Sequence, residues 1–157
     1  MSFRYIGLSP APFAPLSALD DAALLARGMR RMIVDEKPGF PCRVTLEDAE
    51  PGESVLLIPF EHQPAHSPYR ASGPVFVREG AQTQFDRVGA PPESLLSRML
   101  SVRAYDRDGM MIAADVTPGD ALESLLEHFF ADQTVAYVHV HNARRGCYAA
   151  RVERPAA

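Results

Sequence analysis

Two histidines and one cysteine near the C-terminal end of the chain are the residues best suited to chemistry. His139 and His141 alternate with valines in residues 137–141, and Cys147 follows after a short polar stretch. Because alternate side chains of a strand point to the same face, both imidazoles are predicted to share one face. Imidazole nitrogens and thiolate sulfurs are the usual donors to zinc, so these three residues are candidate metal ligands. Such a site needs a further ligand, from one of three residues: His62, His66 or Cys42.

His141 and Cys147 are also a candidate catalytic pair. If residues 142–146 form the turn of a β-hairpin, Val140 lies opposite Tyr148. The same register places His141 opposite Cys147, with their Cβ atoms about 5 Å apart. An imidazolium at that distance lowers the pKa of a thiol and produces a nucleophilic thiolate. The sequence shows no oxyanion site and no group that would orient the imidazole. The alternative to both hypotheses is a pair of histidines on the polar face of an edge hairpin.

Arginines in two separate segments predict a binding site for a small anion, and this is the leading hypothesis. Guanidinium groups offer fork-shaped pairs of donors that match carboxylate or phosphate. We expect the site in a cleft between residues 61–73, read as a long polar loop, and the hairpin of residues 135–153. Arginines would neutralise the ligand charge and the other side chains would orient the ligand. The expected ligand-binding residues are Tyr69, Arg70, Ser72, His139, His141, Asn142, Arg144 and Arg145. The alternative is that Arg144 and Arg145 lie at the exposed tip of the hairpin, where they only contact water.

The elements that must position these residues are short strands and about three helices, which predicts an α+β fold with a largely antiparallel sheet. Helices are expected at residues 18–27, where Ser17 and Asp20 resemble a capping box, and at 91–99, which two prolines begin. A third is expected at 122–130, where leucine and phenylalanine recur at helical spacing. Strands are expected at residues 3–8, 32–34, 42–46, 54–60, 75–77, 100–105 and 110–116, and in the hairpin of residues 135–153.

The hairpin of residues 100–116 has a predicted register. With residues 107–109 as its loop, Val102 lies opposite Ala114, and apolar residues meet on one face. Gly109 would supply the left-handed backbone position that such a loop requires.

Length and composition predict a single globular domain over residues 1–157. The chain is 46% hydrophobic and carries a formal net charge of -4, so we expect no partnership with nucleic acid or anionic membranes. It contains no apolar run of about 18 residues and no signal-peptide pattern. Cys42 and Cys147 are its two cysteines, which favours reduced thiols and a cytoplasmic location, with a single bridge between them as the alternative. No motif indicates a cofactor.

With residues 41–79 and 137–153 in view, the chain resembles, over most of its length, a bacterial family of uncharacterised single-domain proteins of similar length. The resemblance rests on the following residues: Cys42, Arg43 and Val44; Asp48 through Glu53; Glu61, His62 and Gln63; and Ser67 through Pro74. It implies a stand-alone bacterial domain. The family has no assigned activity, so the resemblance transfers no catalytic residue.

An interaction module is a further hypothesis. The proline-rich residues 9–15 or an exposed sheet edge would then contact a second copy of the chain and form a homodimer.

Overall fold

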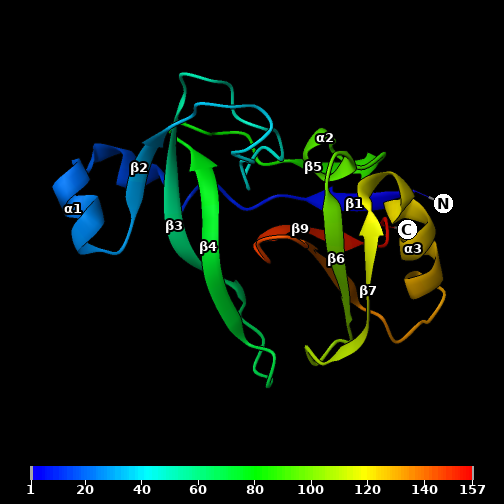
Figure 1. The fold of residues 1–157 in the computed structure, drawn as a ribbon. Coiled ribbons are helices and arrows are strands. Elements are labelled where there is room, and N and C mark those ends of the chain that lie inside the picture. Colours follow the sequence, from blue (N-terminus) through cyan, green and yellow to red (C-terminus); the bar gives the residue numbers. More distant parts are fainter. Residues whose placement is uncertain (1, 157) are drawn as a thin grey trace.

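Two antiparallel β-sheets lie side by side in the computed structural model, which describes residues 2–156 (Figure 1). The larger sheet has the strand order β5-β1-β9-β8-β6-β7, and the smaller has β2-β3-β4. The strands are β1 (Phe3–Ile6), β2 (Arg30–Ile33), β3 (Ser54–Gln63), β4 (Ala71–Arg78), β5 (Asp86–Gly89), β6 (Met99–Tyr105), β7 (Met111–Pro118), β8 (Tyr137–Asn142) and β9 (Tyr148–Glu153). The fold is α+β with antiparallel sheets, as the sequence predicts.

Three short α-helices accompany the sheets within residues 2–156: α1 (Asp21–Ala26), α2 (Glu93–Leu96) and α3 (Leu122–Phe130). The predicted first helix is shorter than expected because Asp20, not Ser17, is its N-cap, with Oδ1 accepting from the amide of Ala23 at 2.8 Å. The predicted second helix ends early because Met99 already belongs to β6. None of the helices in this part of the chain has the length and apolar character needed to span a bilayer.

The larger sheet is covered by α3 on one face (Figure 1). The predicted apolar stripe is confirmed, since Leu122, Leu126 and Phe130 are buried against the sheet, and the ring of Phe130 stacks on Phe3 with centroids 5.4 Å apart. A second apolar core lies on the smaller sheet, where Leu24 of α1 packs among residues of β3 and β4. Each sheet therefore has its own core, and the region where they meet is free to hold polar groups.

Residues 40–49, which we name the bridging segment, connect the two sheets. Its residue Val44 packs in the core of the smaller sheet and Leu46 in that of the larger sheet. The backbone of Arg43 donates to Phe76 of β4 at 2.9 Å and accepts from Leu8, just after β1, at 2.7 Å. The predicted strand at residues 42–46 is therefore wrong, because the segment turns between two sheets instead of extending along either one.

Both predicted hairpin registers are wrong, and both strand pairs contain a β-bulge. In β6–β7 the bulge next to Tyr105 moves Val102 opposite Asp115. In β8–β9 the pairing passes from Val140↔Ala150 to His141↔Tyr148. His141 pairs with Tyr148 because the connection between β8 and β9 is one residue longer than predicted, so Cys147 does not lie opposite His141. The bulge then moves Val140 one residue further along β9.

We expect Gly7→Ala to destabilise the protein because the bridging segment leaves no room for a side chain there. A Cβ at Gly7 would lie 2.4 Å from the carbonyl oxygen of Val44 and 2.9 Å from that of Arg43. Urea unfolding should show a loss of about 1–3 kcal/mol. In the control Gly73→Ala the nearest atom, on His62, is 3.7 Å away, and the change should stay within about 0.5 kcal/mol. Equal losses in the two variants would contradict this account.

Candidate functional site

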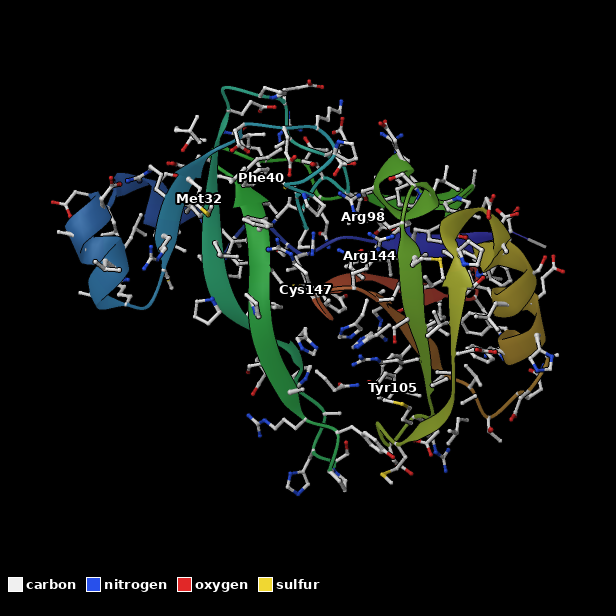
Figure 2. All side chains as sticks on the ribbon, viewed as in Figure 1. Met32, Phe40, Arg98, Tyr105, Arg144 and Cys147 are labelled. Atoms are coloured by element: carbon white, nitrogen blue, oxygen red, sulfur yellow. The ribbon has the colours of Figure 1, made fainter. Side chains whose placement is uncertain are left out.

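A cavity of about 550 Å³ opens where the bridging segment, the start of β6 and the β8–β9 turn meet. Arg98, Arg144 and Cys147, which line it, lie between the two sheets (Figure 2). Four arginines line this cavity, which we name the arginine pocket: Arg43, Arg98, Arg144 and Arg145. Its walls also include apolar side chains, among them Phe76 and Leu96.

Arg43 is the buried member of the pocket, with 2% of its surface exposed. Its Nη1 donates to the carbonyl oxygen of Pro41 at 2.7 Å, and its Nε donates to that of Tyr148 in β9. No carboxylate forms an ion pair with it in the described part of the chain. Burial lowers the pKa of the Arg43 guanidinium to about 10, so it still carries its charge at neutral pH. Its hydrogen bonds go to neutral carbonyl oxygens, and the nearby Asp48 carboxylate, which is paired with Arg98, favours its charge from a distance.

The other arginines of the pocket divide into one structural and two exposed groups. Arg98 forms a two-pronged ion pair with the buried Asp48, at 2.6 and 3.2 Å, and so holds the bridging segment against α2. Arg144 and Arg145 are exposed on the β8–β9 turn and form no ion pair within residues 2–156. Glu36 and Asp120 also line the pocket. The guanidinium groups outside the Asp48 pair therefore outnumber the carboxylates beside them.

Part of the predicted ligand-binding set is assembled in this pocket and part is not. Asn142, Arg144 and Arg145 line it, together with Cys147. Residues 61–73 do not line it. The predicted loop is shorter than expected, at residues 64–70, because the ends of the range belong to β3 and β4, and the hairpin that they form leads away from the pocket. In that hairpin Arg70 pairs with Glu61 at 2.9 Å.

The two remaining residues of that hairpin also lie apart from the pocket. Tyr69 packs against Tyr105 with ring centroids 6.3 Å apart. Ser72 lines a separate shallow groove beside β2.

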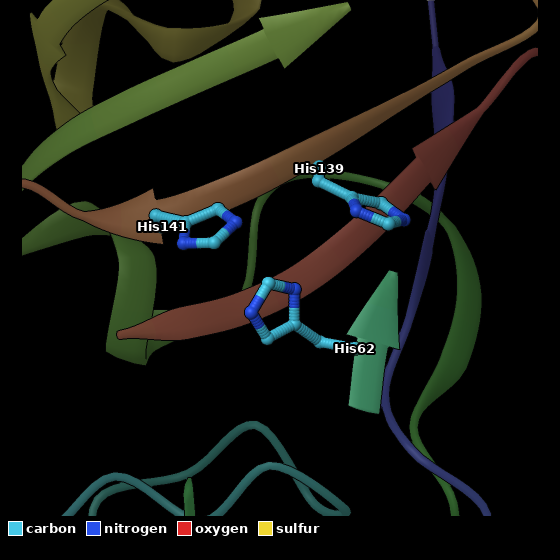
Figure 3. A group of neighbouring side chains, drawn as sticks. All are labelled: His62, His139 and His141. Carbon is cyan, nitrogen blue, oxygen red and sulfur yellow. The ribbon is translucent and has the colours of Figure 1, made fainter. Parts of the chain in front are cut away.

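His139 and His141 lie outside the arginine pocket and are fully buried on the face of β8 that meets the smaller sheet. His62 of β3 reaches toward them, and one ring nitrogen from each histidine lies within 4.8 Å of the others (Figure 3). We name these residues the three-histidine cluster. Cys147, Cys42 and His66 do not belong to it.

The predicted catalytic pair does not form. His141 Nδ1 bonds to the carbonyl oxygen of Gly146 at 2.9 Å, and no hydrogen bond joins His141 to Cys147 within residues 2–156. Both cysteines are free.

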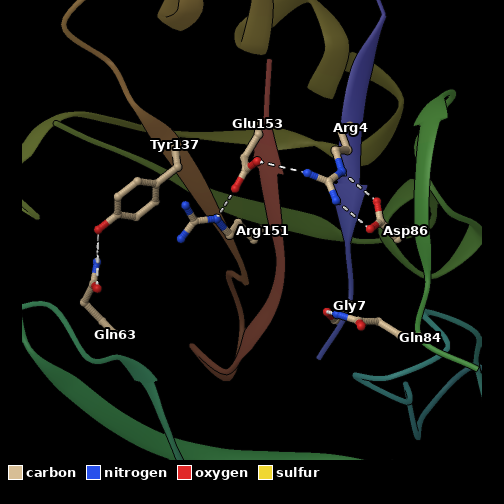
Figure 4. A network of polar contacts seen from close by, with 8 residues as sticks. All are labelled: Arg4, Gly7, Gln63, Gln84, Asp86, Tyr137, Arg151 and Glu153. Carbon is tan, nitrogen blue, oxygen red and sulfur yellow. Dashed lines mark hydrogen bonds and ion pairs between the residues drawn. The ribbon is translucent and has the colours of Figure 1, made fainter. Parts of the chain in front are cut away.

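Aromatic and polar contacts hold the histidine rings in place. The ring of Tyr148 stacks on His62 and meets His139 and His141 edge to face, with centroids 5.1–5.6 Å apart. Beside them, Gln63 Nε2 donates to the hydroxyl of Tyr137 at 3.0 Å and ties the end of β3 to β8 (Figure 4). The two sheets are therefore joined on both sides of the cluster.

Burial keeps the cluster uncharged at neutral pH. It lowers the pKa of His139 to about 3 and that of His141 to about 4, and the nearby guanidinium groups of Arg151 and Arg103 add to this. Burial also lowers the pKa of His62. These imidazoles are therefore available as neutral nitrogen donors and acceptors.

Sequence reasoning did not assign Arg43 to a site. The available signal was a single charged residue inside an apolar run, since Cys42 precedes it and Val44 follows it. A charge in such a run is either paired in the core or placed for a ligand.

Comparison with known proteins identifies one family. The model of the family described as "Protein of unknown function (DUF1203)" matches residues 39–154. No curated protein and no solved structure matches the chain. The matched range includes the whole three-histidine cluster and all four arginines of the arginine pocket.

Stability should fall as the pH is lowered below about 6.5, because His139 and His141 bind protons in the unfolded chain before they do so in the folded one. Their stabilising contribution is complete above the unfolded pKa and is lost as the pH falls toward 4 and 3. Between the folded and unfolded pKa values, each histidine adds about 1.4 kcal/mol per pH unit to the slope of the free energy of unfolding against pH. Urea unfolding between pH 7 and 4 measures it.

The variant His141→Gln should have a shallower slope, and the variant His128→Gln, which changes an exposed residue, should keep that of the wild type. Identical slopes in all three proteins would refute the buried, neutral assignment.

Proposed function

The chain belongs to the DUF1203 family of proteins of unknown function, and we propose that it binds a small anionic ligand, a carboxylate or a phosphate, in the arginine pocket. The observation that carries this proposal is the buried guanidinium of Arg43, which has no carboxylate partner within residues 2–156. A buried charge without a counter-charge in direct contact is costly, and a bound anion would supply one.

The pocket has the size and wall chemistry of a site for a metabolite. Ligand sites commonly occupy about 300–1,000 Å³ and combine apolar walls with a few polar groups, and this pocket holds about 550 Å³. In this proposal Arg43 anchors the anion, Arg144 and Arg145 close over it from the rim, and the Asn142 amide orients it. Phe76 and Leu96 would contact an apolar part of the ligand.

Arginines would bind the anion, as the sequence predicts, but at a different place from the predicted cleft. The ligand would lie beside the bridging segment and not beside residues 61–73. His139 and His141 take no part in holding it, because they lie outside the pocket lining.

A bacterial and cytoplasmic setting belongs to the same proposal. The cytoplasmic part is supported by the free thiols of Cys42 and Cys147, which are typical of a reducing compartment. The bacterial part rests on the family resemblance of the sequence alone. Pairing of two copies through a sheet edge or residues 9–15 stays a prediction.

Ligand binding can be tested by thermal shift against a panel of carboxylated and phosphorylated metabolites in buffer with EDTA. At least one compound should raise the Tm, and its affinity, measured by calorimetry, should fall about tenfold in Arg145→Gln, which removes one charged hydrogen-bonding group. Arg107→Gln is the matched control, because Arg107 is exposed on the distant β6–β7 turn. Either of two results would reject the proposal: no compound raises the Tm, or Arg145→Gln and Arg107→Gln bind equally well.

A further inference from the structure

We propose that the three-histidine cluster is a binding site for a divalent transition metal ion, with zinc as the first candidate and one coordination position left open. His62 comes from the smaller sheet, and His139 and His141 come from the larger one (Figure 3). Three histidine nitrogens with a fourth position free for water or a ligand are one of the known donor sets of zinc in proteins. This site is separate from the arginine pocket.

The spacing of the donor atoms fits a metal ion after a small adjustment. The ring nitrogens lie within 4.8 Å of one another, and a tetrahedral zinc with bonds of 2.0–2.1 Å requires them about 3.3 Å apart. His62 lies in the irregular stretch between Phe60 and Gln63, where the pairing of β3 with β4 is interrupted. Because no ladder pairing fixes this stretch, a local movement there would bring the His62 ring closer to the other two.

The cluster contains three buried nitrogen atoms that have no hydrogen-bond partner in the described part of the chain. They are His62 Nδ1, His139 Nδ1 and His141 Nε2. Buried polar atoms are nearly always satisfied, and each exception requires an explanation. Three such atoms on three neighbouring imidazoles have one economical explanation, a shared ligand that accepts lone pairs.

The hydrogen bond of His141 prepares it as a ligand. The carbonyl oxygen of Gly146 can only accept, so the Nδ1 atom 2.9 Å away must carry the ring proton. The Nε2 lone pair is then unprotonated and free. Metal-binding histidines are commonly oriented in this way, with the second nitrogen donating to a backbone carbonyl. Nε2 is also the His141 atom that has no hydrogen-bond partner, so this tautomer leaves its lone pair available to a metal ion.

The donor atoms restrict which metal ion would bind, and the surrounding charges restrict which group would occupy its open coordination position. Donors that are all imidazole favour zinc, copper, nickel or cobalt over magnesium or calcium, which prefer oxygen. Arg103 and Arg151 lie close enough to depress the pKa of His139, and no carboxylate belongs to the group. A dication in this cationic setting is best accommodated when its open position holds an anion such as hydroxide. Burial keeps the imidazoles unprotonated, so protons compete little for the site.

The test uses untagged, EDTA-treated protein titrated with zinc sulfate, and with cobalt chloride as a spectroscopic probe. We expect one equivalent of zinc by calorimetry and elemental analysis, a higher Tm, and the intense visible bands of tetrahedral cobalt. His62→Gln changes a half-buried ligand and should weaken zinc binding at least about tenfold. His66→Gln and His128→Gln remove the two exposed histidines outside the cluster and should bind as the wild type does.

Three outcomes would overturn the proposal: substoichiometric zinc, unchanged affinity in His62→Gln, or loss of binding in either control variant. If His62→Gln does not fold, the wild-type cobalt spectrum decides, because a spectrum without tetrahedral bands rejects the site. The anion titration in EDTA is independent, so either proposal can fail alone.

Discussion

Arg43 is the residue on which the arrangement of the two sheets depends. Its backbone amide donates to β4 of the smaller sheet, its carbonyl accepts from the chain just after β1, and its side chain donates to β9. These bonds run in three directions from one residue between two separate apolar cores. Because each core covers one sheet only, the relative position of the sheets relies on the bridging segment, which packs into both cores, and on polar contacts at the junction. Arg43 makes several of these polar contacts.

The two candidate sites follow from this junction. Apolar packing fills the interior of each sheet layer, and the junction is where polar side chains from distant parts of the chain are left facing each other. Tyr148 lies between the sites, since its carbonyl oxygen holds Arg43 at the arginine pocket and its ring contacts all three histidines of the cluster. One residue of β9 therefore contacts functional side chains of both sites.

Burial lowers the pKa values at both sites but leaves them with different charges at neutral pH. It lowers the pKa of the Arg43 guanidinium to about 10, which leaves that group charged at neutral pH, and it lowers the pKa values of His139 and His141 to about 3 and 4, which leaves them neutral. The same physical effect thus leaves a cation at Arg43, whose pKa stays above neutral pH in spite of burial, and turns the histidines into neutral nitrogen donors. The difference comes from the ordinary pKa values of the two side-chain types.

The α+β class, most strand positions, the apolar stripe of α3 and the shared face of His139 and His141 were readable from the sequence alone, because they depend on local periodicity. The hairpin registers were not, since each bulge is selected by the packing of the whole sheet and one inserted residue changes every partner beyond it. Cys147 was wrongly paired with His141 because the connection between β8 and β9 is one residue longer than the turn predicted from the sequence. Only the tertiary structure brought His62 to the histidines of β8 and Arg43 to the hairpin arginines, because these contacts join residues far apart in the chain and carry no local signal.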